Sequence, residues 1–252
     1  MVTSLSIGTG GLGRFGNQLW TIAGVIGIAS RNLQEYAFPH WKNHDNALFG
    51  SEVTDFEQEL VTPLPRIPDG LEWHEYGYFW GYREIKLMHK HTSINAHLQS
   101  PKFFEHCIDA VRQRLAFKNE PEPNDYCAIH YRAGDYIDDP NAYHPRQSTE
   151  YYLQAIGRMP AFTRYIVFSD DIEAAKSRLN GLNAIYRQGH YLEDFKMMKQ
   201  CKHFIIANSS FSAMAALLAD QPGKIVVAPK QWFGPGLGIS ARDIYHKDWI
   251  VV

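Results

Sequence analysis

Residues 126–228 alternate between short apolar segments and segments with helical spacing, and this alternation constrains the fold more than any other feature of the chain. Strands that alternate with helices at short intervals form a parallel sheet covered by helices. The pattern predicts strands at 126–131, 165–168, 203–207 and 224–228, and helices at 150–159, 171–179, 194–201 and 211–219. We therefore predict an α/β fold.

A linker separates this region from the N-terminal half of the chain. Residues 118–126, KNEPEPNDY, combine two prolines with charges and asparagines, as is typical of the segments between domains. We predict an N-terminal domain of residues 1–120 and a C-terminal domain of residues 121–252. Within the N-terminal domain the pattern predicts strands at 4–9 and 33–38 and helices at 17–31 and 103–117.

Charge and composition exclude several classes of function. The formal net charge is −2 and no basic run is present, so we expect no nucleic-acid partner. No apolar run approaches the roughly 20 residues that span a bilayer, and we expect neither a transmembrane segment nor a signal peptide. The three cysteines are far apart and form no C-x-x-C pair, which indicates reduced thiols and a cytoplasmic location.

The glycine-rich segment at residues 11–16, GLGRFG, has three interpretations. A dinucleotide-binding turn needs an acidic residue about 20 residues later, and Glu35 is the candidate, although it falls inside an expected strand. A turn without a ligand is the second interpretation. In the third, the loop brings backbone N–H groups to a sugar nucleotide, with Asn17 as the first polar side chain at a helix N-terminus.

Polar residues follow the first strand of the C-terminal half, in the sequence HYRAGDY. Ligands of open α/β sheets bind at the carboxyl ends of the strands. His130 and Arg132 share one side of this strand because they are two residues apart. The planar fork of Arg132 suits a phosphate, although a surface ion pair between Arg132 and Asp135 is an equal alternative.

Two further strand ends carry suitable residues. Asp170 and Asp171 follow the second strand, where they either cap the next helix or hold Arg132 in place. Ser209, Ser210 and Ser212 crowd a helix N-terminus, which is either an anion site or an ordinary N-cap. The chain has no Asp-x-Asp, no H-E-x-x-H and no Cys/His ligand cluster, so we expect no metal.

An aromatic segment, residues 72–82 (EWHEYGYFWGY), lies in the N-terminal half. Its rings either stack on a sugar or pack in the core, and we expect core packing. The aromatic side chains concerned are those of Trp73, Tyr76, Tyr78, Phe79, Trp80 and Tyr82.

Five motifs, in order, resemble those of glycosyltransferase family 11, the α-1,2-fucosyltransferases that use GDP-fucose. They are GGLGRFGNQLW, HYRAGDY, VFSDD, DFKMMKQCKHFIIANSSFS and IVVAPKQWF, between residues 10 and 233. The resemblance implies a GT-B-like fold, with two Rossmann-like α/β domains whose parallel sheets face a central cleft. It implies inverting transfer of L-fucose from a GDP-sugar donor to a glycan acceptor without a metal or other cofactor, with the donor on the C-terminal domain.

The resemblance also implies roles for individual residues. Arg132 matches the arginine that binds the donor β-phosphate and stabilises the leaving group, and His130 and Asp194 match residues of the guanine pocket. The other matching positions are Ser210, Phe211 and Ser212 of a phosphate-binding turn, and Gly16 and Asn17 of a loop that closes over the donor phosphates and the fucose.

The sequence departs from the family at three positions. Ala133 replaces a second arginine, and Ala213 and Met214 replace two tryptophans. These changes leave open a GDP-sugar or glycan-binding module without catalysis, and an NAD(P)-dependent oxidoreductase is the other alternative. The general base is unassigned among Asp135, Glu75 and Asp45, of which Asp135 is close to Arg132 in sequence.

Overall fold

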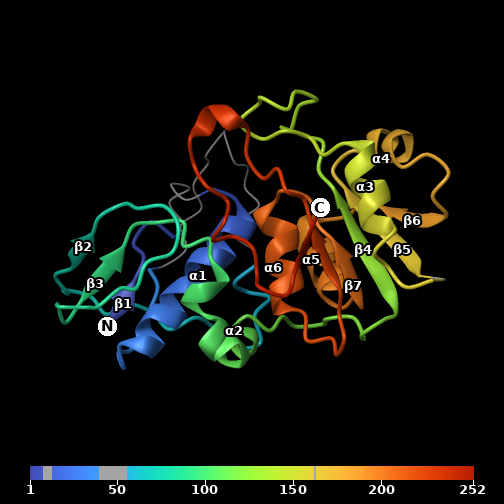
Figure 1. Ribbon diagram of the computed structural model, residues 1–252. Helices are drawn as coiled ribbons and strands as arrows, with labels where there is room; N and C mark the ends of the chain where they lie inside the picture. Colours follow the sequence, from blue (N-terminus) through green and yellow to red (C-terminus); the bar gives the residue numbers. More distant parts are fainter. Residues whose placement is uncertain (8–12, 40–55, 162) are drawn as a thin grey trace. The chain divides into compact units, whose positions relative to one another are not determined.

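The computed structural model describes residues 1–7, 13–39, 56–161 and 163–252 (Figure 1). They form two compact units. The first unit is Met1–Asn119 with Arg242–His246, and the second is Glu120–Ala241 with Lys247–Val252. The division between Asn119 and Glu120 falls inside the predicted linker, whereas the return of Arg242–His246 to the first unit has no counterpart in the sequence analysis.

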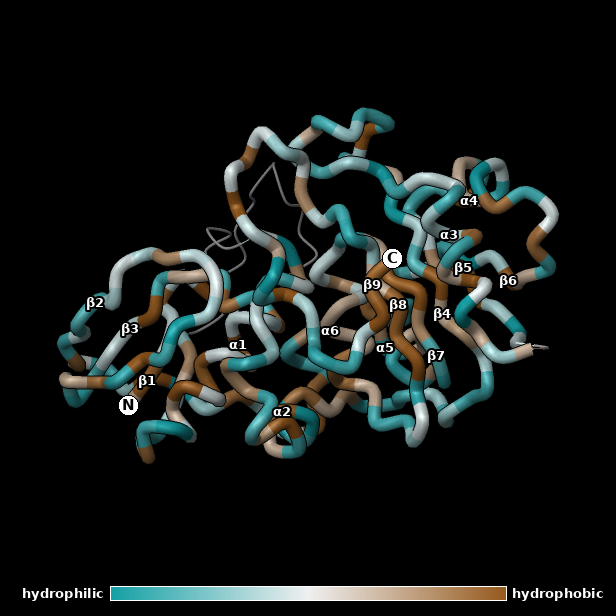
Figure 2. Tube along the Cα trace, in the orientation of Figure 1, coloured by the Kyte–Doolittle hydropathy of each residue, from teal (hydrophilic) through white to brown (hydrophobic). Residues whose placement is uncertain are grey.

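The second unit is built on a six-stranded sheet in which every neighbouring pair of strands is parallel, in the order β6-β5-β4-β7-β8-β9. Its strands are β4 Tyr126–Tyr131, β5 Arg164–Ser169, β6 Ala184–Arg187, β7 His203–Ile205, β8 Val226–Ala228 and β9 Ile250–Val251. The predicted α/β fold with parallel strands is confirmed, and β6 and β9 are additions to it. Figure 2 shows the apolar strands β7 and β8 against more polar connecting segments.

Helices cover both faces of this sheet because side chains alternate along each strand. Cys127, Ile129 and Tyr131 of β4 share a buried cluster with residues of α3 and α4, including Tyr152 and Ala175. The opposite face, which includes His130, packs on α6 through Phe211. The helices are α3 Thr149–Ile156, α4 Ile172–Arg178, α5 Tyr191–Lys199 and α6 Ser210–Leu218. In Figure 1, α3 and α4 lie on one side of β4, and α5 and α6 lie on the other.

The strand order reverses between β4 and β7. From β4 the chain proceeds outward through β5 to β6, then returns to place β7 on the other side of β4 and continues to β8. The two connections that leave β4 and β7 therefore diverge at their carboxyl ends. In open α/β sheets this switch point is where ligands bind.

The first unit packs around α1, Phe15–Arg31, which is buried on nearly every side. Trp20 is fully buried and meets the ring of Phe104 edge-on, with centroids 5.7 Å apart. Gly27 permits close packing, because a Cβ there would lie 2.1 Å from the carbonyl oxygen of Phe103. A three-stranded parallel sheet, in the order β1-β3-β2, completes the unit with strands β1 Val2–Thr3, β2 His74–Tyr76 and β3 Thr92–Ile94.

The predictions for the first unit are corrected in three places. Within 4–9, residues 5–7 form a turn and residues 8–9 lie outside the described part. The expected strand at 33–38 forms only isolated bridges, at Tyr36 and Phe38. Its first residue, Leu33, is not extended, because its φ is +52°. The expected helix at 103–117 is divided, in chain order, into η2 Pro101–Phe103, η3 Glu105–Cys107 and α2 Ile108–Arg114.

The segment Arg242–His246 is fixed to the first unit by Asp243. One carboxylate oxygen lies 2.6 Å from Lys102 Nζ, and the other accepts the Tyr82 N–H at 3.0 Å. Burial raises the pKa of Asp243, but the bonds from Lys102 and Tyr82 outweigh it and lower the pKa below its usual value. Across the ranges described above, no helix is both long and apolar enough to cross a membrane. The predicted GT-B arrangement about a central cleft remains a prediction.

Candidate functional site

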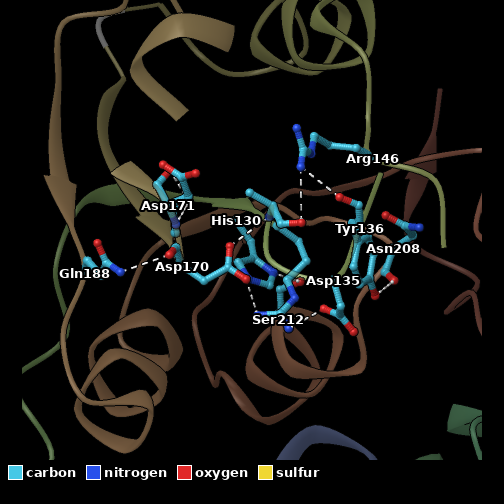
Figure 3. Close-up of polar contacts among 12 residues, drawn as sticks. His130, Asp135, Tyr136, Arg146, Asp170, Asp171, Gln188, Asn208 and Ser212 are labelled. Atoms are coloured by element: carbon cyan, nitrogen blue, oxygen red, sulfur yellow. Dashed lines mark hydrogen bonds and ion pairs between the residues drawn. The ribbon is translucent and has the colours of Figure 1, made fainter. Parts of the chain in front are cut away.

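Polar side chains gather in the second unit, beyond the carboxyl ends of β4, β5 and β7 (Figure 3). Arg132 and Asp135 follow β4, Asp170 follows β5, and Ser209 precedes α6 after β7. In Figure 3, Asp170 and Gln188 lie on one side of His130, and Tyr136 and Asn208 lie on the other. The site therefore occupies the switch point at which the strand order reverses.

Arg132 is held by two carboxylates. Its Nη2 lies 2.7 Å from Asp135 Oδ1, and its Nη1 forms an ion pair with Asp170. The guanidinium carbon lies 5.6 Å from the centroid of the Tyr136 ring. Burial lowers the pKa of Arg132, but the charges of Asp170 and Asp135 outweigh it and raise the pKa. The guanidinium is therefore a fixed positive charge. The predicted ion pair between Arg132 and Asp135 is present, and the phosphate contact stays a prediction.

Of the two roles predicted for Asp170 and Asp171, Asp170 holds Arg132 and Asp171 caps the next helix. Asp170 pairs with Arg132 and also accepts the Ala133 N–H at 2.8 Å. Asp171 caps α4 by accepting the Ala174 N–H at 2.9 Å. Gly134 allows this packing, because a Cβ at Gly134 would lie 2.5 Å from Asp170 Oδ2.

His130 is the buried polar residue at the centre of the site, with 7% of its surface exposed. Its Nδ1 lies 2.8 Å from Ser212 Oγ, and its ring meets Phe211 at a centroid distance of 5.6 Å. Burial and then the charge of Arg132 lower the pKa of His130 to about 4. The imidazole is therefore neutral near pH 7. Since Ser212 Oγ donates to the Ser209 carbonyl at 3.4 Å, we assign the His130 proton to Nδ1.

The N-terminus of α6 has backbone N–H groups that suit an anion, whereas the hydroxyl of Ser212 is already bonded within the protein. Ser209 is the N-cap residue, yet its side chain makes no cap hydrogen bond, so ordinary side-chain capping is absent there. Ser210 and Phe211 are half-buried in the first turn, where N–H groups favour negative charge. Ser212 is fully buried, and its hydroxyl bonds to His130 and the Ser209 carbonyl. Ser212 therefore supports the turn from behind.

Asp194 lies in the first turn of α5, beyond the end of β6. Its two oxygens accept from Arg187 Nε at 2.5 Å and from the Gly189 N–H at 2.9 Å. Between these two residues, Gln188 donates to the Asp170 carbonyl at 2.9 Å. Asp194 therefore organises the β6–α5 turn, and that turn contacts the residue that holds Arg132.

Gly16 and Asn17 belong to the first unit, apart from the other predicted site residues. Gly16 is buried in the first turn of α1, and Asn17 Oδ1 accepts from Gln99 Nε2 at 2.8 Å. Of the segment 11–16, residues 11 and 12 lie outside the described part, as does Asp45 among the candidate bases. Glu35, the residue expected to bind a dinucleotide ribose, is exposed.

Three positions stand out beyond the predicted set. Arg146 Nη2 donates to the Tyr136 carbonyl at 2.8 Å, and Tyr136 donates in turn to the Asn208 carbonyl at 2.9 Å. Asn208 Nδ2 bonds to the carbonyls of Pro145 and Trp232. These bonds join the loops after β4, β7 and β8. Tyr136 and Asn208 lie within two of the motifs quoted above, and Arg146 lies outside them. No local pattern indicates these contacts, because Tyr136 and Asn208 bond to residues from distant parts of the sequence.

The positions that depart from the family pattern are all buried. Ala133 packs in the apolar cluster beneath α3 and α4, and Ala213 and Met214 are fully buried in α6. The alanine at 133 therefore contributes its N–H to Asp170 and its methyl group to the core. In the ranges that the structure covers, no group of three or more His, Cys, Asp and Glu residues could hold a metal ion.

Comparison with known proteins gives consistent matches. A family model described as glycosyl transferase family 11 matches residues 70–252. The O-antigen biosynthesis glycosyltransferase WbnK of Escherichia coli is 36% identical over 133 residues, which cover 49% of this chain and 43% of the relative. An alpha-1,2-colitosyltransferase of Escherichia coli is 30% identical over 174 residues, which cover 64% of this chain and 54% of the relative. The chain spans about half the length of these curated relatives.

Proposed function

Because the chain belongs to glycosyltransferase family 11, we propose that it transfers L-fucose from GDP-fucose to a glycan hydroxyl, in α-1,2 linkage to a galactoside, with inversion and without a metal. The observation that carries the proposal is the position of Arg132 at the switch point of the sheet. It pairs with Asp170, and it follows His130, whose ring bonds to Ser212 in the first turn of α6. A donor diphosphate placed there meets a bidentate cation and the first N–H groups of a helix.

The charge that develops during transfer explains the need for these groups. The acceptor oxygen forms a bond to C1 of the sugar while the bond from C1 to the diphosphate oxygen breaks. The electron pair of that bond stays on the diphosphate, and the acceptor proton goes to a base. Arg132 and the first N–H groups of α6 stabilise the charge on the departing diphosphate, where fixed donors are most effective.

The two carboxylates that contact Arg132 differ in exposure, and we assign them different roles. The Asp135 side chain is 48% exposed and the Asp170 side chain is 26% exposed. Asp170 also bonds to the backbone of Ala133, which fixes it further. We infer that Asp135, at the mouth of the donor site, yields its contact with Arg132 to the donor while Asp170 keeps its own.

His130 and Asp194 support the donor pocket in different ways. Neutral His130 holds Ser212, and Asp194 holds the β6–α5 turn, which leads through Gln188 to Asp170. In this proposal both residues shape the guanine side of the pocket, and Gly16 and Asn17 of the first unit close over the phosphates and the fucose.

Colitose is a second candidate for the transferred sugar. The observation that favours it is the alpha-1,2-colitosyltransferase of Escherichia coli, which matches 64% of this chain. Colitose is fucose without the 3-hydroxyl, so the two donors present the same diphosphate to Arg132.

A thermal-shift series with GDP, UDP, ADP, NAD and NADP, each with and without EDTA, tests the donor. A ligand at 100 times its Kd raises the free energy of unfolding by about 2.7 kcal/mol. We expect a rise with GDP that EDTA does not change. A rise with NAD or NADP and none with GDP would overturn the proposal and favour the oxidoreductase alternative.

Turnover is tested next with GDP-fucose, GDP-colitose and a panel of galactosides, with the product linkage determined by NMR. We expect transfer to the 2-hydroxyl of galactose with inversion at C1. Binding of GDP without transfer or hydrolysis would instead identify a catalytically inactive binding module.

A further inference from the structure

We propose that Tyr78, Trp80 and His97 of the first unit form the subsite that binds a sugar ring of the acceptor glycan. The proposal rests on the function proposed above, which requires a glycan acceptor, and it names the residues that recognise it. It starts from the aromatic segment at residues 72–82, for which core packing was expected and is wrong.

The six aromatic residues of this segment are not in the core. None of them is buried, and Tyr78 is 60% exposed. The other five are half-buried, and apolar surface gathered in one segment is a feature of interaction sites. The segment is nevertheless ordered, because β2 lies within it and pairs with β3.

The rings divide into two sets with different partners. Phe79 and Tyr82 pack on the buried ring of Phe103, at centroid distances of 6.3 and 5.0 Å. Tyr78 and Trp80 instead meet the ring of His97, each at 6.1 Å, with interplanar angles of 86° and 69°. Phe79 and Tyr82 therefore anchor the segment, and Tyr78 and Trp80 place two rings around one imidazole.

This arrangement matches the chemistry of a pyranose. One face of a sugar ring carries C–H groups and packs on an aromatic face, while its rim carries hydroxyls. Tyr and Trp present an apolar body and a polar tip, and the His97 imidazole can bond to a hydroxyl. The surrounding Glu72, Glu75, Arg83 and Glu84 are exposed and charged, which confines the apolar area and disfavours a membrane surface.

The subsite formed by Tyr78, Trp80 and His97 is connected to the start of α1. The Thr21 hydroxyl lies 3.5 Å from the carbonyl oxygen of His97 and 3.1 Å from that of Asn17. Two residues after His97, Gln99 donates to the Asn17 side chain at 2.8 Å. Asn17 is the residue that we expect to contact the donor sugar. A glycan bound by Tyr78, Trp80 and His97 is therefore linked, within the first unit, to the residue that we expect to contact the donor sugar.

Steady-state kinetics of Tyr78→Ala, Trp80→Ala and Trp80→Phe test the proposal. We expect the two alanine variants to raise the acceptor KM about tenfold, the order of one aromatic stacking contact, and to leave the donor KM and GDP-fucose hydrolysis unchanged. Trp80→Phe keeps a ring and should restore most of the affinity. Trp73→Ala is the matched control, because Trp73 belongs to the same segment but meets His91, at 5.6 Å.

An acceptor KM within twofold of wild type in both alanine variants would overturn the proposal, as would an equal rise for Trp73→Ala. If the wild-type protein does not turn over GDP-fucose, the proposed function fails, and the subsite is then tested by binding. Saturation-transfer NMR with a panel of galactosides should show contacts that Tyr78→Ala and Trp80→Ala abolish. Absence of binding to every galactoside by the wild-type protein would also overturn the proposal.

Discussion

His130 Nδ1 lies 2.8 Å from Ser212 Oγ, and this buried bond joins the end of β4 to the first turn of α6. The same imidazole is two residues from Arg132, and the same serine is three residues from the N-cap of α6. The bond therefore fixes the distance between the two groups that we propose bind the donor diphosphate.

Protonation of His130 should destabilise the protein at acidic pH. Its pKa is lowered from 6.5 to about 4 in the folded protein, so between these values the unfolded chain binds more protons. The free energy of unfolding should therefore rise from pH 4 to 6.5 and then level off, with a contribution on the order of 3 kcal/mol. Chemical denaturation at a series of pH values measures this slope.

The His130→Asn variant should lose most of that slope, because its amide keeps a donor near Ser212 but does not titrate in this range. His190→Asn is the control, since His190 is exposed at the start of α5. An unchanged pH dependence in His130→Asn would show that other groups cause the acid destabilisation.

Arg132→Lys should remain folded and lose nearly all transfer activity. Lysine keeps the positive charge but cannot bond in a fork to Asp170 and a phosphate together. Loss of one fixed donor at a developing charge typically reduces the rate by about 10² to 10³-fold. Turnover of GDP-fucose and the melting temperature of the same preparation measure the two effects. Arg164→Lys is the control, because Arg164 stacks on Tyr126 at the other end of the sheet. Wild-type turnover in Arg132→Lys would contradict the assignment.

Substitution of Asp170 should mainly reduce activity, whereas substitution of the adjacent Asp171 should mainly reduce stability. Asp170→Asn retains an acceptor for the Ala133 N–H but removes the charge that holds Arg132, so we expect a large loss of turnover. Asp171→Ala removes the cap of α4, so we expect a loss of about 1 kcal/mol in the free energy of unfolding. Turnover per folded molecule should be unchanged in Asp171→Ala, and equal loss of turnover in both variants would argue against distinct roles.

Gly134→Ala should damage the site through a single methyl group. The added Cβ would lie 2.5 Å from Asp170 Oδ2, so the carboxylate that holds Arg132 must move. We expect weaker GDP binding and a loss of about 1 to 3 kcal/mol in the free energy of unfolding. Gly236→Ala is the matched control, because nothing lies within 4 Å of a Cβ at that position. Calorimetric titration with GDP and thermal melting distinguish the two, and identical GDP affinity in both variants would contradict this account.

In the second unit, the strands at the centre of the sheet are predictable from sequence. Strands β4, β5, β7 and β8 carry apolar side chains on two covered faces, so they stand out as apolar segments. Strand β6 does not stand out in the sequence, because it is an edge strand whose Ile185 is 52% exposed. Strand β9 has two residues and forms only after the chain returns from the first unit. In the first unit, strands of two or three residues are fixed by long-range packing that local patterns do not encode.

The site was predictable where its residues follow a strand, as Arg132 and Asp170 do, because topology brings the carboxyl ends of parallel strands together. The contact between Asp170 and Arg132 also needs the space beside Gly134, and the local sequence does not show this requirement. The exposed ring of Tyr78 and the half-buried ring of Trp80 contradict the expectation of core packing, because hydrophobicity alone does not distinguish a buried ring from one at the surface.

The return of Arg242–His246 to the first unit affects how this protein can be divided or recombined. A fragment that begins at Glu120 carries Asp243 with it but leaves behind Lys102 and the N–H of Tyr82. The two units are therefore not interchangeable modules at a single junction. A chimaera that exchanges the second unit between relatives needs three crossover points, or a matched aspartate and lysine on both parents.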